Sequence, residues 1–286
     1  MKWILTSCAA CVALVLSFTS LAARAEPGPR ADRIRTVFVS AVDGKGASVT
    51  DLTAADLTVK EGGKDRAVTS LQAATGPVQL CILVDDGGSG SFQAGVVSIL
   101  NRMIGHAEYA ISLLNPQPVR LAEYVTDPPT LNAALSKLIQ RGRIQQDGEQ
   151  LIEAVSWSAK DLAKRKAPRP VIIVLTNGGE PMASEARDAI LADLKASGTS
   201  LNVIYINGVG FGKVLGEGPK NSGGVLENAS SNQAIDTAMA KIANNLLHQY
   251  VLTYTLPDGT KPDERLQVSA TRKGITLLAP TRIADK

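Results

Sequence analysis

Three short apolar segments most strongly limit the folds open to this chain. Few polar side chains occur in residues 78–84, 171–175 and 201–206, as expected for strands buried on both faces of a sheet. Helical periodicity is found between and after them, at residues 92–104, 130–139, 148–166, 184–196 and 232–247. Strands that alternate with helices predict an α/β fold with a doubly wound, mostly parallel sheet.

A different pattern flanks this region on both sides. Val37, Val39 and Ala41 alternate with polar neighbours, and "QYVLTYTL" and "RLQVSATR" alternate near the other end. Neither flank has enough strands for a core of its own. We therefore expect an N-terminal β segment (26–76) to pack with a C-terminal one (248–286) as a small β-sandwich. The α/β domain, residues 77–247, is inserted between them.

The first 25 residues predict a signal peptide. Lys2 is followed by an apolar stretch from Ile4 to Leu21 and by the A-x-A cleavage signal at residues 23–25. We expect export, with the mature chain starting near Glu26, in the periplasm or outside the cell. The mature chain is expected to have no transmembrane segment; an uncleaved anchor is the alternative.

Charge and cysteine content exclude several classes of protein. The whole chain carries a formal charge of +3, and losing Lys2 and Arg24 with the signal leaves about +1. We therefore expect no nucleic-acid partner, since no strong basic field is present. Only Cys81 remains after cleavage, inside an apolar strand. It is expected to be an inert core residue without a disulfide.

Polar residues follow the first buried strand, where the functional site of such a sheet lies. The loop "VDDGGSGSF" holds the candidate residues Asp85, Asp86, Ser89 and Ser91. Carboxylates and hydroxyls suit a hard cation such as Mg²⁺. The same residues also suit a capped helix start, with Ser89 or Ser91 accepting backbone N–H groups. The loop alone leaves both interpretations open.

The chain resembles a known family at this point. "ILVDDGGSG" before a helix and "IVLTNGGEP" some ninety residues later resemble a von Willebrand factor type A domain, over residues 77–247. The flanks "VFVSAVDGKGASVTDLTAADLTVKEGG" and "HQYVLTYTLPDG" resemble the exported VWFA-related proteins first recognised in Acidobacteria. The resemblance implies a Rossmann-like sheet and a metal-ion-dependent adhesion site with the pattern D-x-S-x-S, a distant threonine and T-D-G.

Several positions depart from that metal pattern. Asp85 and Ser89 fit it, whereas Gly87 replaces the first serine, Glu149 the threonine and Asn177 the aspartate of T-D-G. Magnesium needs near-octahedral oxygen ligation with one or two carboxylates. We therefore expect Asp85 and Ser89 to form a degenerate site that binds Mg²⁺ or Mn²⁺ weakly or not at all.

Other chemistry lacks its partner residues. Ser89 lies between a strand and a helix like a nucleophile elbow, but the pattern fails at Ser91. The two histidines, His106 and His248, are expected to be surface or packing residues. Residues 207–224 do not complete a phosphate-loop pattern and are expected to form a flexible surface loop. Thr130 is expected to cap the helix over residues 130–139.

These observations favour an exported, non-enzymatic binding or adhesion protein with a protein or glycan ligand. The expected ligand-binding residues are Asp85, Asp86, Ser89, Ser91, Glu149 and Asn177. A structural scaffold of the cell envelope, without a functional metal site, is the alternative. A hydrolase that uses Ser89 is a third hypothesis.

Overall fold

The computed structural model describes residues 32–181, 183–206 and 211–284. The predicted signal peptide lies outside the described residues, so its cleavage and the export of the chain stay predictions. The described elements all belong to one compact unit, Asp32–Lys286. No helix in the described ranges is long and apolar enough to cross a membrane.

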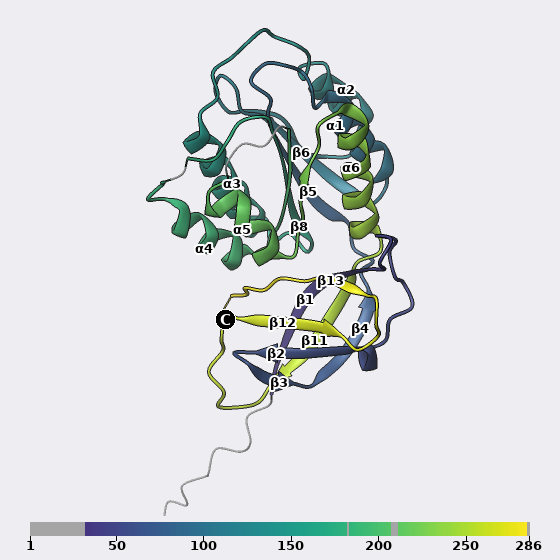
Figure 1. Cartoon of the computed structure of the whole chain (residues 1–286). Coiled ribbons are helices and arrows are strands. Elements are labelled where there is room, and N and C mark those ends of the chain that lie inside the picture. The colour runs from purple at the N-terminus through teal and green to yellow at the C-terminus, as the bar shows by residue number, and fades with distance from the viewer. Residues whose placement is uncertain (1–31, 182, 207–210, 285–286) are drawn as a thin grey trace, which may run out of the picture. The chain divides into compact units, whose positions relative to one another are not determined.

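A six-stranded sheet forms the centre of the α/β region (Figure 1). In sheet order its strands are β10 (Leu226–Asn228), β9 (Ser200–Tyr205), β8 (Pro170–Thr176), β5 (Val78–Asp85), β6 (Ala107–Leu113) and β7 (Val119–Val125). All neighbours are parallel except β7, which is the antiparallel hairpin partner of β6. The expected fold class, a doubly wound and mostly parallel sheet, is confirmed.

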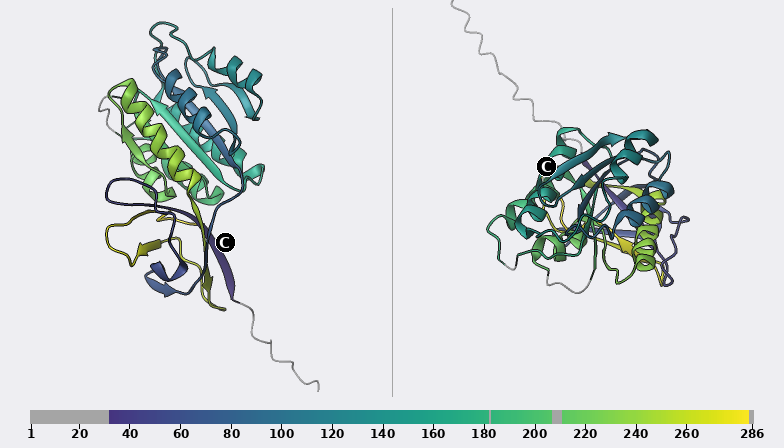
Figure 2. Two further views of the ribbon diagram at one scale, coloured as in Figure 1. Left: turned by 90° about the vertical axis from the view of Figure 1, so that its right-hand side faces the viewer. Right: turned by 90° about the horizontal axis from the view of Figure 1, so that it is seen from above.

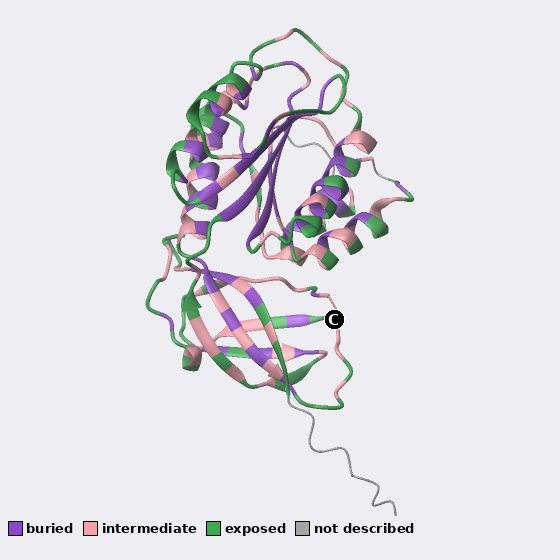
Figure 3. Cartoon of the chain, turned by 180° about the vertical axis from the view of Figure 1, so that it is seen from behind, coloured by how far each residue is buried: buried purple, intermediate pink, exposed green. Residues whose placement is uncertain are grey.

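Helices cover both faces of this sheet (Figures 1 and 3). One face packs against α1 (Gln93–Arg102), α2 (Pro128–Leu135) and α6 (Asn232–Leu247). The other packs against α3 (Gly148–Lys164), α4 (Arg187–Ser197) and α5 (Lys213–Ser222). Along β5, Leu80 and Ile82 enter the first core while Cys81 and Leu83 enter the second. This two-sided burial explains why β5 is apolar throughout.

Cys81 lies in the core, as the sequence predicts. It is a buried free thiol whose Sγ is 3.3 Å from Ser158 Oγ. Burial raises the pKa of the Cys81 thiol because the thiolate would lose its hydration.

The terminal segments form two antiparallel sheets with a shared core. In order, the first holds β13 (Thr276–Leu278), β1 (Arg33–Val42), β11 (Tyr250–Leu256) and β4 (Val68–Ala73); the second holds β12 (Leu266–Ala270), β2 (Leu57–Glu61) and β3 (Lys64–Arg66). Strands β1 and β11 pair along seven residues, from Arg33 with Leu256 to Val39 with Tyr250 (Figure 2). Val39, Val59 and Leu252 lie together in the core between the sheets.

The expected cap at Thr130 is wrong. Helix α2 begins at Pro128, and its N-cap is Asp127, whose carboxylate accepts a hydrogen bond from Thr130 N at 2.9 Å. Proline suits the first helical position because its missing N–H would have no partner there. Thr130 is therefore inside the first turn, and its backbone is the capped group.

The expectation of a flexible loop over residues 207–224 is also wrong for its second half. Helix α5 occupies Lys213–Ser222, with Val214 and Leu215 buried against the sheet. Glu180, from the loop after β8, caps this helix. Its two carboxylate oxygens accept from Val214 N at 2.9 Å and Leu215 N at 2.7 Å. Residues 207–210 lie outside the described part of the chain.

Candidate functional site

The ends of β5 and β8 bring the first candidate residues together. Asp85 and Thr176 are direct neighbours in the parallel pair. The Thr176 hydroxyl donates to Asp85 Oδ2 at 2.6 Å, and Asn177 N donates to Asp85 O at 3.2 Å. Asp85 is only 1% exposed, and its other carboxylate oxygen, Oδ1, is buried without a hydrogen-bond partner. The aspartate is therefore held rigidly, with one acceptor unused.

Asp86 organises the loop that follows. Its carboxylate accepts from Gly88 N at 2.9 Å and from Gly90 N at 2.8 Å. The Arg141 guanidinium donates to Asp86 Oδ1 at 2.7 Å, and Asp86 is 1% exposed. The charge of Asp86 is thus compensated inside the loop, and its oxygens face backbone donors rather than solvent.

Asn177 joins the two loops through its amide nitrogen. Nδ2 donates to Asp86 O at 2.9 Å and to Ser89 Oγ at 3.3 Å, while Oδ1 is buried without a partner. Because Asp86 O can only accept, the nitrogen has to face it. An aspartate at this position would place a carboxylate oxygen against that carbonyl. Asn177 therefore connects the two loops through a hydrogen bond that an aspartate at this position could not make in the same way.

The serines do not cap the next helix. Helix α1 begins at Gln93, with Phe92 at the N-cap and no side-chain cap bond. Ser89 Oγ instead lies 2.8 Å from Ser91 Oγ and accepts from Ser91 N at 3.3 Å. The expectation that these serines cap the helix is therefore wrong, although Ser89 does accept a backbone N–H, as that interpretation predicts. Ser89 is exposed at the rim of the loop.

Glu149 takes part in a different contact. It lies in the first turn of α3, and its Oε2 accepts from the Ser184 hydroxyl at 3.0 Å. The hydrogen bonds described above connect Asp85, Ser89 and Asn177, whereas the Glu149 carboxylate is bound to the loop before α4. The assignment of these residues to ligand binding stays a prediction.

A segment that sequence reasoning missed covers the glycine loop. Arg141 N donates to Gly88 O and Ile144 N to Gly87 O, both at 2.8 Å. Gln146 Nε2 donates to Asp85 O at 2.9 Å. The approach is close: a Cβ on Gly88 would lie 2.0 Å from the carbonyl oxygen of Gly142. The glycines of "DDGGSG" were the available signal, because they permit another backbone to approach closely.

The residues present do not fit the divalent cation that the family resemblance implies. Among the described residues, no group of three or more His, Cys, Asp or Glu side chains could hold a metal. Asp85 is the one carboxylate of this loop that is not paired with an arginine. The two orphaned oxygens, Asp85 Oδ1 and Asn177 Oδ1, are chemically suitable donors for a hard cation. These two oxygens are too few to hold a divalent cation, because Gly87 has no hydroxyl and the Glu149 carboxylate is bonded to Ser184.

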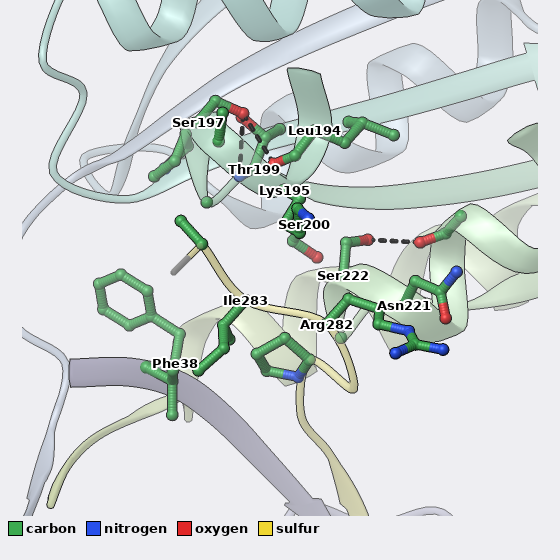
Figure 4. A pocket seen from close by; sticks show the side chains of 18 of the residues that line it. Phe38, Leu194, Lys195, Ser197, Thr199, Ser200, Asn221, Ser222, Arg282 and Ile283 are labelled. Atoms are coloured by element: carbon green, nitrogen blue, oxygen red, sulfur yellow. Dashed lines mark hydrogen bonds between the residues drawn. The ribbon is translucent and has the colours of Figure 1, made fainter. Parts of the chain in front are cut away.

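A cavity of about 790 Å³ lies near the opposite end of the sheet (Figure 4). Several polar groups that line it are already bonded to the protein. Ser197 Oγ lies within hydrogen-bond distance of Leu194 O and Thr199 Oγ1, and the Ser222 hydroxyl donates to Gly218 O. Lys195 and Arg282 pair with Glu264. These groups stabilise the walls, so the strand-end loop remains the stronger candidate site.

No protein-family model matches the chain, and no curated protein matches it. The VWA domain of SpRpn10 is similar at 14% identity and a TM-score of 0.45, over 59% of this chain and 97% of that one. Proximal thread matrix protein 1 from the mussel byssus is similar at 14% identity and a TM-score of 0.47. The match covers 66% of this chain and 50% of that one. A von Willebrand factor type A structure from Catenulispora acidiphila is similar at 10% identity and a TM-score of 0.44. The match covers 91% of this chain and 76% of that one. The SpRpn10 and Catenulispora structures are von Willebrand factor type A domains, and the likeness of this chain to them is one of fold.

Proposed function

We propose that this chain is an exported, non-enzymatic binding protein that contacts a protein or glycan ligand through the strand-end face of its α/β domain. The contact depends weakly or not at all on a divalent cation. One observation carries the proposal: the exposed Ser89 stands at the rim of a loop that Asp86 and Arg141 fix from inside. The family resemblance supports the same kind of function.

A rigid polar rim is well suited to direct hydrogen bonding. The Ser89 and Ser91 hydroxyls can each donate and accept, so they match the hydroxyls of a glycan or the amides of a protein. The loop needs little further ordering on binding, because Asp86 already holds two of its backbone N–H groups. Preorganisation of this kind reduces the entropy lost on association.

The geometry gives no support to a hydrolase. A serine nucleophile needs a base within hydrogen-bond reach. Ser89 follows the carboxyl end of β5, whereas the backbone of His106 pairs with Val78 at the first residue of that strand. His248 Nδ1 contacts Asn244 O at the end of α6. Neither imidazole is bonded to the loop that holds Ser89.

The test is binding of the mature chain to purified glycans and purified cell-envelope proteins, measured by biolayer interferometry in MgCl₂ and in EDTA. We expect a ligand whose affinity is unchanged by EDTA and falls at least about tenfold in Ser89→Ala/Ser91→Ala. Thr58→Ala, an exposed residue of strand β2, is the control and should bind like the wild type. Loss of binding in EDTA would refute the cation-independent contact.

A structural scaffold is the second candidate, and one observation favours it. The side chains of Asp85, Asp86 and Asn177 all make hydrogen bonds inside the protein. Such a face could serve only to hold its own loops. If the serine variants bind every ligand as the wild type does, the scaffold interpretation replaces the binding one.

Export has its own test. Intact-mass measurement of the protein recovered from the periplasm and the medium should give a chain that begins near Glu26, because the A-x-A signal ends at residue 25. A chain that keeps its first 25 residues in the membrane fraction would refute cleavage and support an anchor.

A further inference from the structure

The Gln146 carboxamide lies in a space that two glycines leave open. A Cβ on Gly87 would lie 3.1 Å from Gln146 Oε1 and 3.2 Å from Gln146 Cδ. A Cβ on Gly178 would lie 2.7 Å from Gln146 Nε2 and 3.1 Å from Asp85 Oδ2. Together with the bond from Nε2 to the backbone carbonyl Asp85 O, these distances place the amide between the two loops.

That space is the one a metal-site side chain would need. In the D-x-S-x-S metal pattern of the family that this chain resembles, the first serine ligand falls on position 87. Here Gly87 has φ +56°, a left-handed conformation that a serine adopts only with strain. A serine Cβ would also meet the Gln146 amide at a distance tighter than ordinary contact. Gln146 and a serine ligand at position 87 therefore compete for the same place.

The charge of the loop also opposes a cation. Arg141 is bonded to Asp86 Oδ1 at 2.7 Å and to Asn115 O at 2.7 Å, so its positive charge is held inside the cluster. The formal charge of Asp85, Asp86 and Arg141 together is about −1, which gives little attraction for a divalent ion.

Two potential ligands nevertheless remain in place. Asp85 Oδ1 and Asn177 Oδ1 are buried acceptors without a donor, and Ser89 Oγ is bonded to the same asparagine. Carboxylate, amide and hydroxyl oxygens are what a hard cation uses. We propose that Gln146 excludes divalent ions: its carboxamide occupies the space that a side chain at position 87 would need and ties the two loops together in place of a cation. This inference rests on the cation-independent contact proposed above.

The test is titration of MnCl₂ into the mature protein, followed by isothermal calorimetry and by the paramagnetic signal of free Mn²⁺. Gln146→Ala removes the amide and should bind Mn²⁺ at least about tenfold more tightly than the wild type. Adding Asp85→Asn to that variant should abolish the gain. Gln145→Ala is the matched control, because Gln145 is an exposed neighbour of the same residue type. Gln146→Ser serves if the alanine variant unfolds, which circular dichroism shows.

The outcomes separate this inference from the proposed function. Equal Mn²⁺ affinity in wild type and in the Gln146 variants refutes the exclusion by Gln146 but leaves the cation-independent contact standing. Micromolar binding by the wild type, weakened in Gln146→Ala, would make Gln146 a ligand and refute both. A gain that survives Asp85→Asn would place the cation elsewhere and refute the inference.

Discussion

Glu180 is predicted to determine whether α5 forms at its observed position. The Glu180 side chain is buried, and it accepts from two backbone N–H groups in the first turn of that helix. Among the described residues no other side chain caps this helix, since its N-cap is Gly212. Replacing Glu180 with alanine leaves both N–H groups without their acceptor, and residues Val214 and Leu215 are fully buried.

The size of the effect follows from those two bonds. A hydrogen bond to a charged group contributes about 1.5–3 kcal/mol, and part of the loss is recovered if water enters. We therefore expect Glu180→Ala to lower the free energy of unfolding by about 2–4 kcal/mol. In a domain of this size that is a fall in Tm of about 4–16 °C. Glu180→Gln keeps one acceptor oxygen and should lose about half as much.

Gly212 supplies an independent check. Its φ is −75°, which any residue adopts, but a Cβ there would lie 2.4 Å from Glu180 Oε1. Gly212→Ala should therefore destabilise the protein by displacing the Glu180 carboxylate. The double variant Glu180→Ala/Gly212→Ala should be clearly less destabilised than the sum of the two single variants, because they disrupt the same contact.

The assay is urea unfolding of the mature protein at neutral pH, followed by far-UV circular dichroism. Glu185→Ala is the control, because Glu185 is exposed on the same loop. If Glu180→Ala lies within about 0.5 kcal/mol of that control, the two bonds do not stabilise α5 and the reasoning is refuted.

Further predictions concern three buried or paired side chains. Tyr254→Phe removes the hydroxyl that donates to the buried Glu61 at 2.8 Å, and should lower the free energy of unfolding by about 1–3 kcal/mol in the same urea assay. Burial raises the pKa of Tyr254, so above a pH of about 10 this tyrosine ionises only in the unfolded chain. Wild-type stability should therefore fall as the pH rises above about 10, and the fall should be smaller in Tyr254→Phe. The Cys81 thiol should resist iodoacetamide at pH ~8 until urea unfolds the protein, as mass spectrometry would show. Hydrogen bonds from two α1 side chains lower the pKa of Asp236, so stability should fall as the pH drops below about 3.8, and Asp236→Asn should reduce this fall.

The sheet and most helices could be predicted because their signals are local. A strand buried on both faces, such as β5, has to be apolar throughout. The predicted range of α6 agrees with the observed one. Helix α4 ends at Gly198 in the left-handed conformation, as its C-cap signal indicates. Asp127 was also within reach of sequence reasoning, since proline at the first helical position points to the residue before it.

The signals that were missed are distant in sequence. Helix α5 contains glycines and a proline, and its cap comes from Glu180, 34 residues before the capped Val214. At the candidate site, the juxtaposition of Asp85 and Asn177 follows from strands that end at one edge of a sheet. The positions of Arg141 and Gln146 do not, because they belong to a loop without periodicity and act through tertiary contacts alone.

The departures from the family's metal pattern are physically linked. Gly87 gives room to the Gln146 amide, and Gln146 binds the backbone of Asp85. Asn177 supplies the N–H that satisfies Asp86 O, which an aspartate would repel. The changes at positions 87 and 177 each remove a potential ligand, and each is accompanied by an amide hydrogen bond between the loops. These two amides connect the loops, while Asp85 Oδ1 and Asn177 Oδ1 stay buried without a partner, so part of the cost of a half-satisfied polar cluster remains.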